Sequence, residues 1–151
     1  MSDAVDRETR TIRFRRTLAT TREDVFDAWT RPERISDWWD PTGAPLVACS
    51  IDLRPGGAFR FENAGHSPPF VGTYRTVDRP SLLVFEAMGA VGTVSLQASG
   101  ASTIMSVTIT CPSDEHFEMF VKLGVDTNTA KTMDNLVAHV SAPRQRSQPC
   151  R

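Results

Sequence analysis

The sequence predicts an α+β protein in which a curved antiparallel sheet of about seven strands packs against a long C-terminal helix. The first observation is an alternating strand pattern near residue 11, followed by two short helical segments. The second is a series of short strand-like runs joined by tight turns, up to residue 111. The third is a helical apolar stripe after residue 113. This order is typical of an antiparallel sheet with its helices on one face, and a curved sheet around a helix leaves space between them.

Size and composition indicate one domain, which we place at residues 11–141 between flexible ends at 1–10 and 142–151. With 40% hydrophobic and 23% charged residues, the chain has the composition of an ordinary soluble domain. Its net charge of -1, without a block of like charge, argues against binding to nucleic acid or to a membrane surface. It lacks an apolar signal core and a run of membrane-spanning length, so we expect a cytoplasmic protein.

The three cysteines, Cys49, Cys111 and Cys150, lack the spacing of a metal or redox site. Cys49 and Cys111 lie in apolar strand-like runs, which predicts buried reduced thiols. The histidines do not have metal-ligand spacing either. We therefore expect neither a metal site nor a cofactor.

The first elements are a strand and two short helices. In "TIRFRRTL" the apolar residues share one face with Arg16, and the other residues occupy the opposite face. The next segment, "TTREDVFDAW", has helical spacing, with Thr20 or Thr21 as the N-cap and acidic residues in the first turn. A second helix begins at Pro32, which suits a first helical position, and ends before Pro41.

Six further strands are expected as an antiparallel meander with short connections. Turn sequences such as "RPGG" and "DRPS" separate them, and Asp52 with Arg54 is expected to fix the first of these turns. "RPGG" is too short for a phosphate-binding loop, and its glycines permit a tight turn. The predicted strands are "LVACSIDL", "AFRFE", "FVGTYRTV", "LLVFEAM", "TVSLQA" and "STIMSVTIT".

A single long helix is predicted from its N-cap at Ser113 to about Val140. Its apolar residues recur at steps of four and three. Asp126 interrupts this stripe, and Gly124 with the polar segment 127–129 weakens the middle of the helix. We therefore expect a bend or poor packing there.

Four motifs in the same order and spacing carry a resemblance to a known family: "EDVFDAWTRPERISDWW", "DLRPGGAFRF", "GTYRTVDRPSLLVFEA" and "TMDNLVAHV". Over roughly residues 11–140 the chain resembles the Bet v 1-like, START-related helix-grip superfamily. Within it, the chain is similar to the branch named after the C-terminal domain of the Hsp90 ATPase activator. The resemblance implies a seven-stranded sheet wrapped round the C-terminal helix, enclosing a pocket for hydrophobic small molecules.

One departure from the family lies in the last helix. Related sequences usually carry Gly-Trp shortly before the leucine-containing helix end, where this chain has Asn128-Thr129. The loss of that aromatic ring is expected to enlarge or hydrate the inner end of the pocket. The chain also lacks room for the extra N-terminal domain of the eukaryotic activator, so the resemblance does not imply full co-chaperone activity.

Aromatic side chains supply the candidate pocket residues, and plain core packing is the alternative for each of them. Trp38 and Trp39 are adjacent and cannot share a helix face, so we expect one in the core and one at the pocket rim. Trp29 is assigned to the core, and Phe70 is a further available ring. The candidate ligand-binding residues are Trp38, Trp39, Phe59, Phe61, Tyr74, Phe85, Phe120, Leu123 and Asn128.

Candidate polar groups are few. His66, in the loop "NAGHSPP", is the best candidate for a polar group at a pocket mouth, and a plain surface position is the alternative. Glu62 lies in a strand beside phenylalanine and points either inward or to solvent. A catalytic base needs a positioned partner, and sequence spacing supplies none for the histidines.

The function we favour is non-enzymatic binding of a small hydrophobic or aromatic molecule between the sheet and the last helix. Two alternatives stay open. An enzyme of the polyketide cyclase or aromatase kind would need inward polar residues with perturbed pKa values, such as His66 with Glu62. An interaction module, acting on a chaperone or forming a homodimer, would show a filled cavity and an exposed apolar patch.

Overall fold

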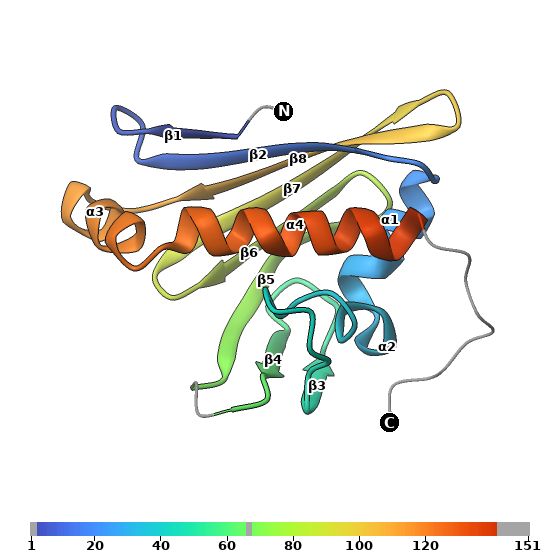
Figure 1. The fold of residues 1–151 in the computed structure, drawn as a ribbon, viewed down its shortest axis with the longest axis horizontal. Helices are drawn as coiled ribbons and strands as arrows, with labels where there is room; N and C mark the ends of the chain where they lie inside the picture. The colour runs from blue at the N-terminus through green and yellow to red at the C-terminus, as the bar shows by residue number, and fades with distance from the viewer. Residues whose placement is uncertain (1–2, 66–67, 142–151) are drawn as a thin grey trace.

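A computed structural model of the chain describes residues 3–65 and 68–141, and its centre is one curved antiparallel sheet (Figure 1). Within these residues eight strands lie in the order β1-β2-β8-β7-β6-β5-β4-β3, so β3 to β8 form a meander whose last strand pairs with β2. All neighbouring strands are antiparallel. The strands are β1 (Ala4–Asp6), β2 (Thr11–Leu18), β3 (Ala48–Ile51), β4 (Ala58–Glu62), β5 (Phe70–Asp78), β6 (Leu82–Ala87), β7 (Ala90–Ser99) and β8 (Ser102–Thr110).

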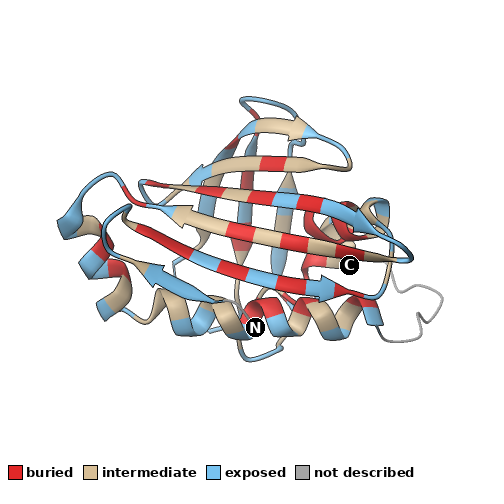
Figure 2. Ribbon diagram, turned by 90° about the horizontal axis from the view of Figure 1, so that it is seen from above, coloured by how far each residue is buried: buried red, intermediate tan, exposed pale blue. Residues whose placement is uncertain are grey.

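The longest helix, α4 (Val125–Ser141), crosses one face of the sheet (Figure 1). At one end of α4 lies α3 (Asp114–Lys122), and at the other end lie α1 (Arg22–Thr30) and α2 (Pro32–Ile35). Buried and exposed residues alternate along the strands, as expected for a sheet with one covered face (Figure 2). The predicted α+β class, with an antiparallel sheet gripping a C-terminal helix, is confirmed.

The alternation in β2 places a charged residue, Arg16, on the buried face. Its guanidinium pairs with Asp3 (Nη1 to Oδ1, 2.6 Å) and with Asp134 of α4 (Nε to Oδ1, 3.0 Å). The hydrogen bond from Arg16 holds the pKa of Asp3 below its usual value. Because a buried cation needs such partners, Arg16 ties both the N-terminal segment and α4 to the sheet.

Two predicted local contacts are confirmed. Thr21 is the N-cap of α1, since its side chain accepts a hydrogen bond from the Asp24 backbone N–H at 3.2 Å. In the turn after β3, the Arg54 guanidinium donates to the Asp52 carboxylate at 2.9 Å. Each contact joins residues two or three positions apart, which is why the sequence alone indicated it.

The first strand corrects the prediction that residues 1–10 form a flexible end. Ala4–Asp6 pair with β2, and this strand raises the number from about seven to eight. The Asp6 carboxylate accepts backbone hydrogen bonds from Glu8 (3.0 Å) and Thr9 (3.3 Å), which shape the turn into β2. A strand of three residues is too short to show an alternating sequence pattern. Its place in the sheet is set by tertiary contacts. Residues 142–151 lie outside the described part of the chain.

The predicted single C-terminal helix is wrong, although the expected irregularity is in the right place. The chain leaves α3 after Lys122 and begins α4 at Val125. Gly124 has φ +80°, a left-handed conformation that ends a helix and that glycine adopts readily. The break therefore sets α3 apart from α4, and the two apolar faces need not point the same way.

Candidate functional site

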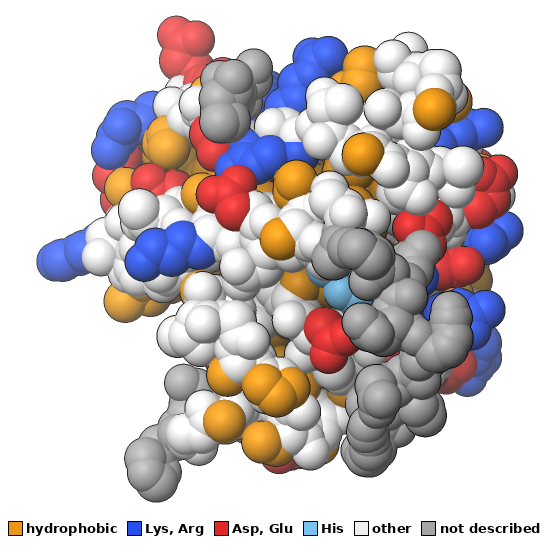
Figure 3. Space-filling model, turned by 45° about the vertical axis from the view of Figure 1, so that its right-hand side comes forward, with side chains coloured by type: hydrophobic (Ala, Val, Ile, Leu, Met, Phe, Trp, Pro, Cys, Tyr) orange, Lys and Arg blue, Asp and Glu red, His pale blue; other side chains and the backbone are white. Residues whose placement is uncertain are grey.

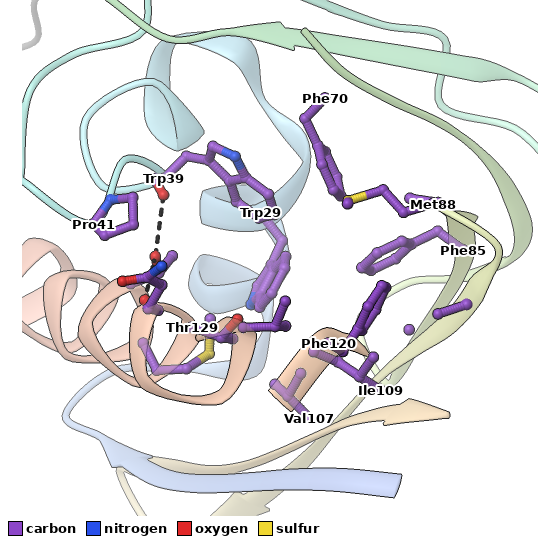
Figure 4. Close-up of a pocket in the computed structure, with 17 residues that line it drawn as sticks. Trp29, Trp39, Pro41, Phe70, Phe85, Met88, Val107, Ile109, Phe120 and Thr129 are labelled. Atoms are coloured by element: carbon purple, nitrogen blue, oxygen red, sulfur yellow. Dashed lines mark hydrogen bonds between the residues drawn. The ribbon is translucent and has the colours of Figure 1, made fainter. Parts of the chain in front are cut away.

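A cavity of about 200 Å³ lies between α4 and the strands β6, β7 and β8 (Figure 4). The sheet supplies one wall, α3 and α4 supply the opposite wall, and the segments around Trp39 and Met88 lie at its sides. The lining residues are Trp29, Trp39, Pro41, Phe70, Phe85, Ala87, Met88, Ala90, Gly92, Val107, Ile109, Phe120, Val125, Asn128, Thr129, Thr132 and Met133.

The sheet wall depends on a glycine beneath an aromatic ring. Gly92 of β7 pairs with Phe85 of β6, and a Cβ added at residue 92 would lie 2.6 Å from Phe85 Cζ. No side chain larger than hydrogen fits there without moving the ring. Gly92 therefore lets Phe85 lie against β7 as part of the cavity wall.

The helical wall begins directly after the break at Gly124. Val125, Asn128, Thr129 and Thr132 follow at helical spacing, so one side of the first turns of α4 borders the cavity. Phe120 completes the wall from α3, with its ring centroid 4.6 Å from that of His116. The helix break thus brings residues of two helices to one cavity.

Hydrogen bonds from α4 hold the segment that carries Trp39. The Thr132 hydroxyl lies 3.2 Å from the Trp39 carbonyl oxygen and 3.1 Å from that of Asn128, so it donates to these acceptors and not into the cavity (Figure 4). The Asn135 amide donates to the Asp40 carbonyl at 2.9 Å. Trp39 is therefore held at a fixed distance from α4.

The Asp40 carboxylate is a buried charge that belongs to the same segment. It accepts hydrogen bonds from the Thr42 N–H (2.8 Å), the Thr42 hydroxyl (2.7 Å) and the Asn63 amide (2.7 Å). Burial alone would raise the pKa of Asp40. The hydrogen bonds from Asn63 and Thr42 outweigh this effect, so the pKa lies below its usual value. The carboxylate is thus used to shape the loop, and it does not line the cavity.

A second group of aromatic rings, next to the cavity, forms solid core. Phe59, Phe61 and Tyr74 are almost fully buried, and the void among them and their neighbours is only about 10 Å³. The Phe59 ring stacks on Phe61 at 5.1 Å and lies 5.0 Å from Tyr74. Burial raises the pKa of the Tyr74 phenol. This aromatic cluster has no room for a ligand.

The nine candidate residues fall into three groups. Four of them line the cavity, and four are buried in the core beside it. Leu123 is 62% exposed and lies outside the lining, so its predicted place is wrong. The cavity residues are Trp39, Phe85, Phe120 and Asn128; the core residues are Trp38, Phe59, Phe61 and Tyr74.

The tryptophans divide as expected for adjacent residues. Trp38 is fully buried and its indole N–H donates to the Ala28 carbonyl at 3.1 Å, whereas Trp39 is half-buried at the cavity. Trp29, assigned to the core, is buried but also lines the cavity. Its indole N–H points to Met105 Sδ at 3.4 Å, so the cavity meets its ring and not its polar atom.

Of the two candidate polar groups, only Glu62 belongs to the described part of the chain. The Glu62 carboxylate accepts a hydrogen bond from Arg60 at 2.9 Å and lies outside the cavity lining. His66 lies outside the described residues. The loss of an aromatic ring at Asn128-Thr129 is predicted to affect the inner end of the pocket, but Asn128 is exposed and therefore lies at the mouth. Among the described lining residues there is no Asp, Glu, His, Lys, Arg, Cys or Tyr.

The sheet, the gripped helix and the cavity between them are the arrangement that the sequence resemblance implied. The chain matches the family model described as "Activator of Hsp90 ATPase homolog 1-like protein" over residues 19–141. The chain belongs to this family. It has the helix-grip fold, which often binds hydrophobic ligands, and the resemblance stated from the sequence is confirmed.

Solved bacterial structures share the fold at low sequence identity. The NMR structure of a protein from Arthrobacter aurescens has TM-score 0.83 and 19% identity, covering 94% of this chain and 92% of that one. A crystal structure from Mycobacterium smegmatis has TM-score 0.81 and 16% identity, covering 93% and 97%. One from Nitrosomonas europaea has TM-score 0.79 and 19% identity, covering 87% and 94%. No curated protein matches the chain. These likenesses concern the fold alone.

Within the described residues, no helix combines the length and apolar composition required to cross a membrane. On the face shown in Figure 3, acidic and basic side chains are interspersed and not gathered by sign. The expectations about nucleic acid, membrane surfaces, a homodimer and a chaperone contact stay predictions.

Proposed function

We propose that this protein binds a small, uncharged aromatic molecule in the cavity between α4 and β6–β8. The observation that carries the proposal is the cavity of about 200 Å³, whose described lining is apolar or neutral throughout. A charged ligand would lose its hydration there without gaining an ionic partner. Aromatic walls from Trp39, Phe85 and Phe120 favour stacking or edge contacts with another ring.

Cavity size limits the ligand to about two fused rings. An engineered cavity of about 150 Å³ with Leu, Ile and Phe walls binds benzene, and this cavity is somewhat larger. Sites for drug-sized molecules begin at about 300 Å³. If it were dry and empty, the cavity would reduce stability by about 5 kcal/mol, a large share of the about 5–15 kcal/mol of a typical domain. A ligand that fills it is therefore expected to stabilise the fold.

The polar residues of the lining favour one orientation of the ligand. Asn128 is exposed and Thr129 is half-buried, and both come from the turn of α4 at the mouth. The third, Thr132, already has acceptors in the protein. A single hydroxyl or amine on the ligand would therefore face Asn128 and Thr129, with the rings inside.

A pair of naphthalene derivatives tests the proposal. At pH 7 2-naphthol is neutral and 2-naphthoate is an anion of similar size. Titration calorimetry is expected to show binding of 2-naphthol, with 2-naphthoate weaker by about tenfold or more because the cavity offers no counter-charge. Equal affinity for the two compounds, or no heat from 2-naphthol, would contradict the proposal.

The cyclase-like alternative would need an acid or base next to the ligand. The described lining supplies no ionisable side chain for that role. The geometry therefore gives more support to binding than to acid–base catalysis within this cavity. The interaction-module alternative predicted a filled cavity, which is not what the structure has.

A further inference from the structure

The turn between β6 and β7 has an unfavourable residue at the mouth of the cavity. Ala87 pairs with Ala90, so the connection is the two residues Met88 and Gly89, with φ +55° and +79°. Two-residue hairpins with both φ values positive strongly favour Asn-Gly or Asp-Gly. Methionine has no side-chain group that stabilises this left-handed conformation, which is disfavoured for residues with a Cβ.

Packing within the protein does not explain the methionine. Met88 is 56% exposed, so more than half of its surface stays in water in the ligand-free molecule. It nevertheless borders the cavity, and in Figure 4 it points from the turn towards the ring of Phe70. The exposed part of Met88 is therefore available for contact at the mouth.

Contact with α3 fixes the position of the turn. A Cβ added at Gly89 would lie 2.8 Å from Cε1 of His116, so the turn backbone lies directly against that ring. His116 in turn packs on Phe120, which lines the cavity. The strained turn thus presents Met88 at a defined place relative to the cavity wall.

We propose that Met88 is a ligand-contacting residue that closes the mouth of the cavity over the bound ring. A methionine suits this role because it is unbranched and flexible, and its sulfur makes favourable contacts with aromatic rings. The disfavoured backbone conformation is retained because the side chain is needed there when ligand is bound. This inference rests on the proposed function and assigns a specificity-determining residue to it.

The variant Met88→Asn separates the backbone strain of the turn from the ligand contact of the side chain. Asparagine gives the turn its preferred Asn-Gly sequence, so the melting temperature of the ligand-free protein is expected to rise by about 2–6 °C. The same change removes the apolar contact, so the affinity for 2-naphthol is expected to fall about tenfold. Scanning calorimetry and titration calorimetry measure the two effects on the same preparation.

Two control variants accompany it. Met88→Leu keeps an apolar side chain and the strained backbone, and is expected to retain the affinity within about threefold without a gain in stability. Arg10→Asn changes a second non-glycine residue with φ +55° among the described residues. Arg10 lies outside the cavity lining, so this change is expected to leave the affinity unchanged.

The outcomes distinguish this inference from the proposed function. If wild-type protein binds 2-naphthol and Met88→Asn binds it equally well, Met88 is not a ligand contact, while the proposed function stands. If Met88→Asn binds more weakly but is no more stable, the argument from backbone strain is overturned. If wild-type protein does not bind 2-naphthol, both proposals fail together.

Discussion

Replacing Thr129 with tryptophan is expected to abolish the binding of 2-naphthol and to make the protein more stable. Thr129 borders the cavity from α4, and the family resemblance implies a tryptophan at this position. An indole in this place would occupy the space that the ligand needs. Filling most of a void of about 200 Å³ is expected to add about 2–4 kcal/mol to the free energy of unfolding.

The matched control is Thr129→Val, which keeps the shape of the side chain and exchanges only the hydroxyl for a methyl group. We expect this variant to bind 2-naphthol within about threefold of wild type, since the rings make most of the contact. Titration calorimetry and denaturant unfolding of the three proteins provide the comparison. Wild-type affinity in Thr129→Trp would show that the ligand binds elsewhere.

Replacing Phe61 with alanine is expected to lower the free energy of unfolding by about 3–5 kcal/mol and to leave ligand affinity within about threefold. Phe61 is buried in the aromatic cluster beside the cavity, where the remaining void is only about 10 Å³. Its truncation therefore opens a new cavity in solid core, and removes no wall of the ligand site. Phe61→Leu is a milder form of the same test if the alanine variant does not fold.

Phe120→Ala provides the contrast, because Phe120 is also buried but lines the cavity. We expect it to weaken the binding of 2-naphthol about tenfold as well as lowering stability. Urea unfolding and calorimetric binding are measured for both variants. Together they distinguish a residue of the solid core from a residue of the ligand site. An equal loss of affinity in the two would place Phe61 in the ligand site.

Most of the fold follows from short-range patterns in the sequence. The alternation in "TIRFRRTL" identifies β2 and even the buried face that carries Arg16. The two features that were missed depend on contacts distant in sequence or on one backbone angle. The strand Ala4–Asp6 is held by pairing with β2. Helix α3 ends at Lys122, just before the left-handed Gly124, although the apolar spacing continues across the break.

The candidate site was predictable only in part. The period of a sequence pattern shows which residues point inward, but it does not show whether they pack against solid core or border a cavity. Phe61 and Phe85 both belong to strands with inward aromatic residues, yet one meets solid core and the other borders the cavity. Leu123 continued the apolar stripe, but the left-handed residue that follows ends α3 and leaves its side chain exposed. Asn128 lies in the first turn of α4, directly after the same break, and it faces the mouth.

Other cavity residues gave weaker signals. Met88 is not part of a periodic pattern of apolar residues. The one clue in the sequence is a Met-Gly pair where a hairpin turn usually has Asn-Gly. Trp29 satisfies the helical pattern of α1 and was assigned to the core, which is correct for its burial. Its second role as cavity wall depends on the position of α4, which no local pattern specifies.

The most direct test of the central claim is a crystal structure of the wild-type protein grown with saturating 2-naphthol. The account predicts density for the two rings in the cavity, between Phe85 of the sheet and Phe120 of α3. It predicts that the hydroxyl lies towards Asn128 and Thr129 and that Met88 contacts the outer ring. An empty cavity, or 2-naphthol bound only on the outer surface, would contradict the account.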